Sequence, residues 1–553
     1  MNDHIALAEA LFPDVSQTLG DLTARYPGRT LVGDARVTRF APSPTGFMHL
    51  GSLLTSLISE RVAHLSGGVF YLRIEDTDKK REVEGTIDII VNSLRTYHIP
   101  IDEGEVEQGK EVGAYGPYKQ SERLDMYRAC VKHLVETGRA YPCFCTTEEL
   151  SALSAQQEEQ KIRPGYRGKW ATCRTKSVEE ALALVHAGTP YVLRLRSEGN
   201  FDHKIPVLDL IKGQLSLSEN DLDVVLLKSD NYPTYHLAHV VDDHFMGTTD
   251  VIRGDEWLSS TPLHMELWNA FGWSAARYGH MAPIQKIDEG SRRKLSKRKD
   301  PEANLAYYEE KGYPPEAVIE YLLNLANSSF EDWRKEHVTD SVATFPFSLK
   351  KLNNSGALFD EVKLESVSKE VIARMSTDET YERIVAWLTR HDSAFYTIIT
   401  SDPVYTKKIL SIEKDTTKRK DIRYWSDVRG ETTYFFDVCF VTDETLVDMV
   451  RQLVAGDDAK KILDLFVETY NPIDDRELWF AKVKQIASAL GYAEGVKEYK
   501  KDPTSYKGHV GTISQVLRIA MTGKTNTPDL HDIMSVLGSE RVHARIAEMR
   551  ALL

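Results

Sequence analysis

The chain has few cysteines and no long run of apolar residues. Only five of its 553 residues are cysteine, too few for the disulfide framework of a secreted protein, and this scarcity fits a reducing compartment. No stretch approaches the ~20 apolar residues that a membrane-spanning helix needs. The first residues, MNDHIALAEALFPDVSQTL, lack the basic segment and the apolar stretch of a signal peptide. We therefore expect a soluble, cytoplasmic protein without a membrane partner.

An excess of positive charge is also absent. Lys and Arg number 69 against 83 Asp and Glu, and the formal net charge is -14. This balance excludes a uniformly basic nucleic-acid-coating protein, but it leaves room for a polyanion bound at a local basic cluster. The content of 42% hydrophobic and 27% charged residues is typical of globular domains. The length predicts about three to five of them.

The order of predicted elements indicates an α/β region followed by helices. The strand VTRFA, from Val37, precedes a loop, a helix-like stretch at 51–68 and the strand GVFYLRIEDTD. Strand, loop, helix and strand form the first unit of a parallel α/β sheet, which binds ligands at the carboxyl ends of its strands. The runs DVVLLKSD (223–230) and TDVIRGDEW (249–257) are predicted to continue this sheet. After about residue 350, apolar residues recur at helical spacing.

The loop RFAPSPTGFMHLGS (39–52) has features of a phosphate site. Two prolines and a glycine fix a sharp turn after the strand, so that His49 and Gly51 lie at the start of the next helix. Free backbone N–H groups and the helix dipole favour a phosphate there. A histidine can donate to phosphate oxygens, and a glycine lets a nucleotide approach closely. Taken alone, the segment favours only a helix start with an incidental histidine.

The segment SRRKLSKRK (291–299) carries six positive charges. By itself a basic run is more often a solvated face than a site. Together with the earlier loop, however, it resembles the two ATP-binding motifs of class I aminoacyl-tRNA synthetases, His-Ile-Gly-His and Lys-Met-Ser-Lys-Ser. The matching residues here are His49-Leu50-Gly51-Ser52 and Lys294-Leu295-Ser296-Lys297-Arg298. The outer residues Arg292, Arg293 and Lys299 remain candidates for tRNA contact or plain solvation.

Six stretches in order resemble the bacterial-type glutamyl-tRNA synthetases: RFAPSPTG, RIEDTD, GPYKQSERL, VVLLKSDNYPTYHLAHVVDDHFMG, VIRGDEWLSSTP and ISQVLRIAMTGK. The resemblance implies an α/β Rossmann-like class I synthetase catalytic domain with an α+β insertion, followed by a mostly α-helical C-terminal anticodon-binding region. The implied divisions are an N-terminal helical extension (1–36), the first half of the catalytic domain (37–113), an acceptor-binding insertion (114–228), the second half (229–290), the ATP-binding loop with a stem-contact region (291–375) and the helical anticodon-binding domain (376–553).

The resemblance implies a glutamate–tRNA ligase that uses ATP with Mg²⁺. L-Glutamate would form glutamyl-adenylate and pyrophosphate, and then pass to the 3′-terminal adenosine of tRNA-Glu. Because the carboxylate of the substrate is the nucleophile, the protein has to position the reactants and offset phosphate charge. The resemblance assigns catalysis to His49, Lys294 and Lys297, and ATP binding to these residues with Gly51, Ser52 and Ser296.

Glutamate itself needs a cation for its carboxylate and an anion for its ammonium group. By resemblance, Arg39 and Arg253 address the carboxylates, since a guanidinium can pair with both oxygens, and Glu75 binds the ammonium. His239 stands where the family often has an asparagine. The predicted glutamate contacts are Arg39, Ala41, Ser43, Glu75, Tyr235, His239 and Arg253.

Three cysteines of the predicted insertion leave a metal site open. Cys143 and Cys145 in YPCFC, with Cys173 in KWATCR, resemble a zinc knob that some members of the family carry. Zinc usually takes four ligands, and Tyr166 or a nearby histidine would have to be the fourth. We favour three reduced structural cysteines, with bound zinc as the alternative.

Two segments of the helical region combine basic and aromatic residues, TKRKDIRYW (417–425) and VKEYKKDPTSYKG (496–508). Both suit phosphate contact and base stacking, although solvated helix faces look similar. We expect a monomer whose partners are L-glutamate and tRNA-Glu.

Other functions are weighed against this one. A glutamyl-queuosine enzyme lacks a large C-terminal helical region, and glutaminyl-tRNA synthetases have β-barrel anticodon modules, so the helical periodicity disfavours both. Intact His49, Gly51, Lys294 and Lys297 argue against a catalytically silent RNA-binding paralogue. An enzyme that also charges tRNA-Gln fits the sequence equally well.

Overall fold

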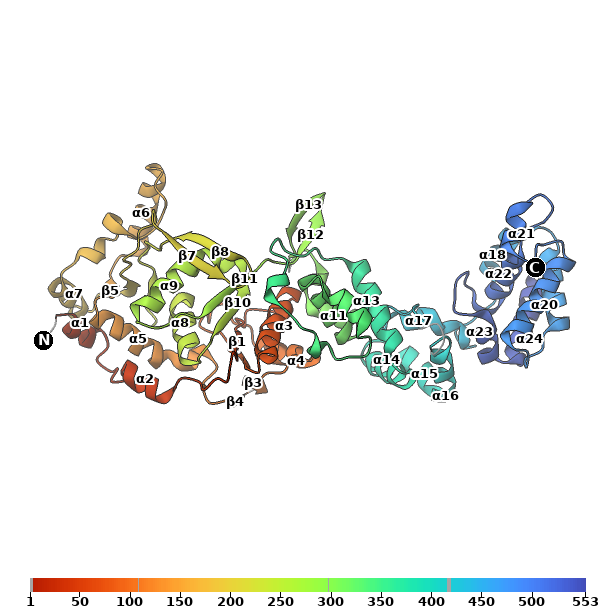
Figure 1. The fold of residues 1–553 in the computed structure, drawn as a ribbon, viewed down its shortest axis with the longest axis horizontal. Helices are drawn as coiled ribbons and strands as arrows, with labels where there is room; N and C mark the ends of the chain where they lie inside the picture. Colours follow the sequence, from red (N-terminus) through yellow and green to blue (C-terminus); the bar gives the residue numbers. More distant parts are fainter. Residues whose placement is uncertain (1–2, 108, 297, 415–418) are drawn as a thin grey trace. The chain divides into compact units, whose positions relative to one another are not determined.

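The computed structural model describes residues 3–107, 109–296, 298–414 and 419–553 (Figure 1). It consists of two compact units, Met1–Tyr307 with Leu322–Asp360, and Tyr308–Tyr321 with Glu361–Leu553. Within the described residues, no helix is both long enough and apolar enough to cross a membrane.

A mostly parallel sheet lies at the centre of the first unit. β1 (Val37–Phe40) pairs in parallel with β2 (Val69–Leu72), and β2 pairs in parallel with β3 (Glu103–Glu107). β4 (Lys110–Val112) closes the edge in the antiparallel sense. All four residues of β1 are buried, as expected for a parallel strand covered on both faces. The predicted strands at VTRFA and GVFYL are therefore confirmed.

A second parallel pair extends this core. β10 (Asp250–Gly254) pairs with β11 (Arg277–Met281), and the N–H of Thr249 donates to the Val37 carbonyl over 2.9 Å. The helix α3 (Leu50–Leu65) connects β1 to β2 and buries Leu53, Leu57 and Ile58. The carboxyl ends of β1, β2 and β10 thus lie close to the N-terminus of α3.

One expectation about the sheet is wrong. The run DVVLLKSD forms β9 (Val225–Leu227), which pairs antiparallel with β6 (Val192–Leu195) in a separate sheet with β5 (Ala140–Cys143), so it does not continue the parallel sheet. A short apolar run shows that a strand is buried, but it does not show which strand lies beside it. Two other strands, β7 (Lys204–Asp209) and β8 (Gly213–Ser218), form a hairpin.

Helices cover the sheets of the first unit. The predicted helical extension forms α1 and α2, and Leu7, Leu11 and Phe12 share one hydrophobic core with Cys130 and Leu134 of α5. β12 (Gln285–Asp288) and β13 (Ser291–Lys294) form an antiparallel hairpin that leads into the basic segment. The remaining helices of this unit are α1 (Asp3–Leu11), α2 (Leu19–Arg25), α4 (Thr86–Thr96), α5 (Leu124–Glu136), α6 (Thr147–Glu159), α7 (Val178–His186), α8 (Tyr235–Phe245), α9 (Thr261–Ala270) and α12 (Phe330–Glu336).

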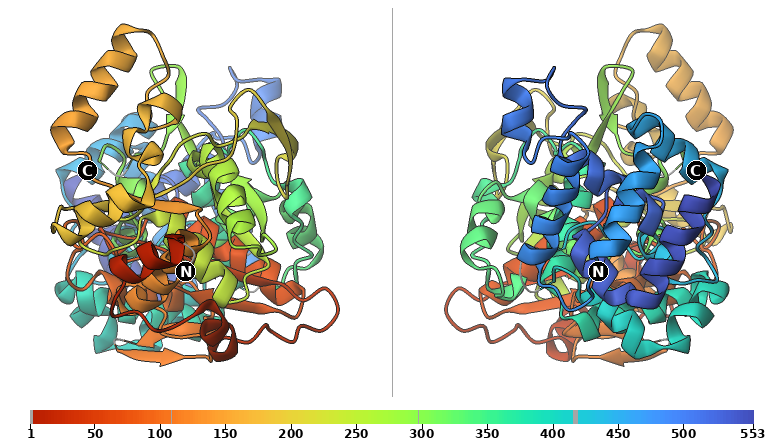
Figure 2. Two further views of the ribbon diagram at one scale, coloured as in Figure 1. Left: turned by 90° about the vertical axis from the view of Figure 1, so that its left-hand side faces the viewer. Right: turned by 90° about the vertical axis from the view of Figure 1, so that its right-hand side faces the viewer.

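Among the residues that the structure describes, the regular elements of the second unit are helices, which confirms the helical region predicted from the apolar spacing. Two of the three unit boundaries fall within α10 (Leu305–Lys311) and α11 (Pro315–Ala326), and the third lies directly before Glu361. α22 supplies much of the core through Ile513, Leu517 and Ala520, which are all fully buried. The helices of the C-terminal residues are drawn in blue in Figure 2. The other helices are α13 (Glu361–Arg374), α14 (Thr377–His391), α15 (Ser393–Ser401), α16 (Pro403–Ser411), α17 (Asp427–Thr432), α18 (Glu444–Leu453), α19 (Asp458–Thr469), α20 (Arg476–Ala489), α21 (Val496–Lys501), α22 (Val510–Thr522), α23 (Leu530–Leu537) and α24 (Ser539–Leu552).

The two basic and aromatic segments of this unit differ in exposure. In TKRKDIRYW, Tyr424 and Trp425 are buried, and Arg419 pairs with Asp421 over 2.7 Å. Base stacking on these rings is therefore excluded, because the aromatic residues belong to the core; Thr417 and Lys418 lie outside the described residues. In VKEYKKDPTSYKG, by contrast, the lysines of α21 are exposed.

Candidate active site

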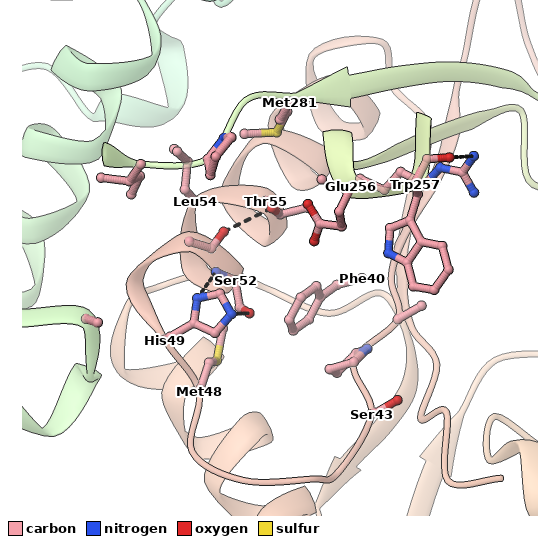
Figure 3. Close-up of a pocket in the computed structure, with 18 of the residues that line it drawn as sticks. Phe40, Ser43, Met48, His49, Ser52, Leu54, Thr55, Glu256, Trp257 and Met281 are labelled. Atoms are coloured by element: carbon pink, nitrogen blue, oxygen red, sulfur yellow. Dashed lines mark hydrogen bonds between the residues drawn. The ribbon is translucent and has the colours of Figure 1, made fainter. Parts of the chain in front are cut away.

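A cavity of about 780 Å³ opens at the carboxyl ends of β1, β2 and β10 (Figure 3). The loop after β1, the first turns of α3, the start of α8 and the segment after β13 all contribute to its wall. The cavity thus collects chain segments that are up to about 250 residues apart. Its lining includes most of the residues that the sequence singled out, namely Arg39, Ala41, Ser43, His49, Gly51, Ser52, Glu75, Tyr235, Arg253, Lys294 and Ser296.

Two predicted site residues remain. His239 is fully buried and does not line the cavity. Lys297 lies outside the residues that the structure describes.

His49 is the N-cap of α3 and folds over its first turn. Nδ1 of His49 accepts a hydrogen bond from the N–H of Ser52 over 3.1 Å, and Nε2 lies 3.0 Å from Ser52 Oγ (Figure 3). A Cβ on Gly51 would lie 3.1 Å from two atoms of the imidazole ring. Glycine at position 51 therefore leaves the space that the folded ring needs, and the helix N-terminus faces the cavity with a histidine beside it.

The segment after β13 is fastened to the protein by Arg293. Its guanidinium donates to both carboxylate oxygens of Asp300, over 2.6 and 2.8 Å, and to Asp288 over 2.6 Å. Asp300 also accepts from the backbone N–H of Ser296 over 2.7 Å, and these donors hold the pKa of its carboxyl well below the ordinary value. Arg293 is thus ion-paired within the protein, which corrects the expectation of plain solvation; its contact with tRNA stays a prediction.

The two arginines of the cavity have different partners. Nε of Arg39 lies 3.3 Å from Asp243 Oδ1, and both side chains are almost fully buried. Arg253, at the end of β10, donates instead to the rings of His280 and His264, over 3.0 and 3.1 Å. Arg39 is therefore compensated by a carboxylate of the protein, whereas the bonds of Arg253 are to neutral acceptors.

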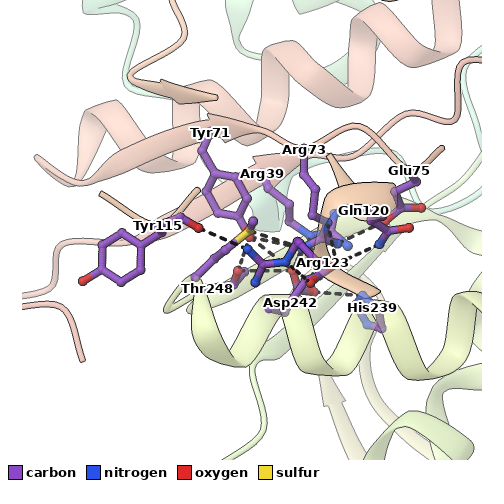
Figure 4. Close-up of polar contacts among 12 residues, drawn as sticks. Arg39, Tyr71, Arg73, Glu75, Tyr115, Gln120, Arg123, His239, Asp242 and Thr248 are labelled. Atoms are coloured by element: carbon purple, nitrogen blue, oxygen red, sulfur yellow. Dashed lines mark hydrogen bonds and ion pairs between the residues drawn. The ribbon is translucent and has the colours of Figure 1, made fainter. Parts of the chain in front are cut away.

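Two adjacent carboxylates of α8, Asp242 and Asp243, hold a buried polar network that includes the cavity residues Arg39 and Glu75 (Figure 4). Asp243 accepts from Arg73 over 2.6 Å, and Asp242 accepts from Arg123 over 2.7 Å. Burial opposes ionisation of Asp243, but the guanidinium groups of Arg73 and Arg39 lower its pKa well below the ordinary value. Glu75 shares this network, since its Oε1 accepts from Arg73 over 3.1 Å; desolvation raises its pKa.

His239 belongs to the same network. Its ring stacks beneath Tyr235, with centroids 5.5 Å apart and an interplanar angle of 11°. Nδ1 lies 2.8 Å from Asp243 Oδ2, and Nε2 lies 3.1 Å from the hydroxyl of Tyr278. Burial lowers the pKa of His239 to about 3, so the ring is neutral. The structure places this residue as a support of Tyr235 in the wall.

Sequence reasoning missed several residues of the site. Trp257 and Glu256 both line the cavity (Figure 3). The ring of Trp257 lies 4.0 Å from that of Tyr235 between centroids, and a carboxylate oxygen of Glu256 lies 3.9 Å from Nζ of Lys294. Both directly follow the segment VIRGD, so their place in the chain was a usable signal. His264 and His280, which contact Arg253, belong to α9 and β11, and no local pattern marks them.

The three cysteines of the insertion come together with Tyr166. Cys145 Sγ lies 3.6 Å from Cys173 Sγ, and the Tyr166 hydroxyl lies 3.4 Å from Cys143 Sγ and 3.3 Å from Cys145 Sγ. The three sulfur atoms lie within 4.8 Å of one another. A hydrogen bond from Cys173, opposed by burial, lowers the pKa of Cys143 to about 4. Three thiols and one phenol thus surround a common point.

Comparison with known proteins gives consistent matches along the chain. Residues 36–366 match a family described as tRNA synthetases class I (E and Q), catalytic domain, and residues 379–550 match an anticodon binding domain. The glutamate–tRNA ligase of Clostridium perfringens strain SM101 is 46% identical over 548 residues, covering 99% of each chain. That of Acetivibrio thermocellus is 45% identical, covering 99% of this chain and 100% of the relative.

A solved structure agrees with these relatives. The crystal structure of a glutamate tRNA ligase from Elizabethkingia meningosepticum in complex with its amino acid has a TM-score of 0.73 and 28% sequence identity. It covers 94% of this chain and 99% of that chain.

Proposed function

Because the chain belongs to the class I tRNA synthetases of the E and Q group, we propose that the cavity at the ends of β1 and β10 is where L-glutamate reacts with ATP to form glutamyl-adenylate, with release of pyrophosphate. The function is that of a glutamate–tRNA ligase, which activates glutamate and esterifies it to tRNA. The observation that carries the proposed site is the convergence of the His49 helix start, the Lys294–Ser296 segment and the charged residues Arg39, Glu75 and Arg253 on one cavity.

One end of the cavity suits the phosphates of ATP. The N-terminus of α3 provides backbone N–H groups, and His49 and Ser52 stand beside them. Lys294, whose side chain is 59% exposed, reaches the cavity from the opposite wall. Attack by the glutamate α-carboxylate on the α-phosphorus places negative charge on phosphate oxygens, and these groups would offset it. ATP enters as its Mg²⁺ complex, in which the metal offsets part of the same charge.

The other end suits glutamate. Arg253 presents a cation whose described hydrogen-bond partners are neutral, so the side-chain carboxylate of glutamate would supply the missing negative charge. Glu75 lines the same cavity and would bind the substrate ammonium. Tyr235, fixed between Trp257 and His239, would hydrogen-bond the ligand. Together these groups hold the α-carboxylate of glutamate toward the phosphate end.

An exchange assay tests this function. Glutamate-dependent exchange of pyrophosphate into ATP, measured with tRNA present, is expected for the purified chain. No exchange at saturating substrates would exclude the enzyme and favour a catalytically silent RNA-binding paralogue. Charging of purified tRNA-Glu and tRNA-Gln in parallel then decides whether one or both are substrates.

We further propose that the insertion (114–228) receives the acceptor end of tRNA and that residues 376–553 bind the anticodon arm. The match of 379–550 to an anticodon-binding family supports the second assignment. The exposed lysines of α21 are candidates for contact with a phosphate backbone.

We also propose that Cys143, Cys145, Cys173 and Tyr166 hold a zinc ion. Sulfur ligands about 2.3 Å from tetrahedral zinc lie just under 4 Å apart, close to the 3.6 Å between Cys145 and Cys173. The depressed pKa of Cys143 also fits a thiolate ligand. This convergence supports the zinc alternative over three separate reduced cysteines.

Metal analysis tests the zinc site. We expect about one zinc per chain by mass spectrometry, a loss of that zinc in Cys143→Ser, and a lower melting temperature after chelation. Cys439→Ser is the matched control, because Cys439 lies in the second unit, and it should retain the metal. A zinc-free wild-type protein, purified without chelator, would leave the three cysteines as structural thiols.

A further inference from the structure

Arg253 is held by neutral hydrogen-bond acceptors. Its Nε donates to Nε2 of His280 over 3.0 Å, and its Nη1 contacts Nδ1 of His264 over 3.1 Å. Nη2 lies 3.3 Å from the Trp257 carbonyl and 3.2 Å from Thr261 Oγ1. Arg253 is only 5% exposed, and among the described residues none of these partners is a carboxylate. A buried cation without a counter-charge is costly, so its retention calls for a function.

His280 has a defined tautomer because of Asp209, the last residue of β7. Asp209 Oδ2 lies 2.6 Å from His280 Nδ1, so Nδ1 carries the proton and donates it to the carboxylate. Nε2 is then left with its lone pair toward the guanidinium of Arg253. Asp209 is itself fixed by the backbone N–H groups of Ile211 and Lys212, over 2.9 and 2.8 Å.

His264 has a defined tautomer for a related reason. Because its Nδ1 accepts from Arg253, its proton is on Nε2, which lies 3.0 Å from Nδ1 of His236. Burial, together with the charge of Arg253, lowers the pKa of His236 to about 4 and that of His264 well below its ordinary value. His264 is thus a neutral acceptor toward Arg253.

We propose that His264, His280 and Asp209 form a positioning shell for Arg253, which fixes the guanidinium with neutral acceptors and leaves its charge for the side-chain carboxylate of glutamate. This inference rests on the proposed function, in which Arg253 binds that carboxylate. It makes the three residues determinants of specificity: glutamine, which has no charge, would leave the buried cation unpaired. Arg39 is the contrasting case, because Asp243 already offsets its charge.

Four variants of two histidines separate the parts of the proposal. His280→Gln and His264→Gln keep a neutral acceptor, and His280→Leu removes it. His280→Glu replaces the neutral acceptor with a carboxylate that would pair with Arg253 internally. The matched control is His244→Gln on α8, whose half-buried ring stacks on Trp273 at 3.8 Å and makes no described hydrogen bond to Arg253.

The experiment measures KM for glutamate, KM for ATP, kcat and melting temperature by exchange and thermal unfolding. His280→Leu is expected to raise KM for glutamate about 10- to 100-fold, as for the loss of a hydrogen bond to a charged group, while KM for ATP and kcat change less than about threefold. The glutamine variants should stay within about threefold of the wild type. His280→Glu should raise KM for glutamate and lower the preference for glutamate over glutamine.

Three results would overturn the inference. The first is an unchanged KM for glutamate in His280→Leu, and the second is a glutamine variant as impaired as the leucine variant. The third is a His280→Leu protein in which kcat falls, both KM values rise equally and the melting temperature is lower. Arg253→Gln distinguishes a failure of the proposed function from a failure of the positioning shell. If Arg253→Gln leaves KM for glutamate unchanged, the assignment of Arg253 in the proposed function fails. If Arg253→Gln raises KM but His280→Leu does not, only the positioning shell fails.

Discussion

At the scale of single residues, the buried cations of the site differ in whether a carboxylate of the protein pairs with them. Asp243 lies against Arg39, Arg73 and His239, with distances of 2.6 to 3.3 Å to its nearest partner atoms. Its carboxylate is shared by two buried guanidinium groups. Removing that charge would leave Arg39 without a described carboxylate partner and Arg73 with only Glu75 and Asp242, in a medium of low polarity where incompletely paired ions are costly.

Asp243→Asn should therefore lower the free energy of unfolding by about 3–5 kcal/mol. Urea unfolding, followed by circular dichroism, measures it. Asp125→Asn is the control, since the side chain of Asp125 is 91% exposed, and it should change stability by less than about 0.5 kcal/mol. Equal stability of the two variants would show that the network is not what compensates Arg39 and Arg73.

The role of Lys297 stays a prediction from the sequence, because this residue lies outside the described residues. If its ammonium meets the phosphates of ATP, Lys297→Ala should lower kcat for exchange about 100- to 1,000-fold and leave the melting temperature unchanged. The exposed Lys299, two residues further on, provides the control Lys299→Ala. Unchanged exchange rates in Lys297→Ala would contradict the phosphate assignment.

At the scale of elements, the basic segment after β13 is a structured connection and not a uniform surface run. Arg293 joins Asp288 of the hairpin to Asp300 beyond the motif, and Asp300 also binds the backbone of Ser296. This closes a short loop that carries Lys294 and Ser296 at the cavity. Arg293 thus shapes the loop that carries Lys294 and Ser296.

Breaking this closure should affect ATP more than glutamate. Asp300→Asn is expected to raise KM for ATP about tenfold, as for the loss of charge-assisted hydrogen bonds, with KM for glutamate unchanged. Arg292→Ala is the control, because Arg292 is exposed on the same hairpin. An equal rise in both KM values would point to a general disturbance of the cavity.

At the scale of the whole molecule, buried neutral histidines make stability depend on pH. Burial lowers the pKa values of His236 and His244 to about 4 and that of His239 to about 3. The unfolded chain, with histidine pKa values near 6.5, binds more protons than the folded chain between about pH 6.5 and pH 4. Stability therefore rises with pH across this window and is lost as the pH falls through it.

When the pH is lowered from 7 to 5, the free energy of unfolding should accordingly decrease by on the order of 1–3 kcal/mol for each such histidine. The decrease would be seen as a lower urea midpoint. His244→Leu should make the dependence shallower, because it removes one of these groups. His186→Leu, at an exposed position, is the control and should leave the slope as it is. A midpoint independent of pH in this range would show that the rings are not held neutral by the fold.

The sequence alone determined the features that depend on neighbouring residues or on the order of motifs along the chain. The turn PSPTG and Gly51 predicted where α3 begins, apolar periodicity predicted the helical second unit, and the ordered motifs led to the family and to the lining of the cavity. These features depend on residues that are near in the chain, or on motifs that keep their order, so a linear reading can find them.

Only the tertiary structure decided which distant groups meet. DVVLLKSD paired with β6 and not with the parallel sheet, Tyr424 and Trp425 became core, and Arg293 paired with Asp288 and Asp300. The environment of Arg253 came from Asp209, His264 and His280, which belong to three separate elements. Hydrogen bonds and burial depend on distance in space and not in sequence, and for that reason the composition of this shell emerged only when the chain was folded.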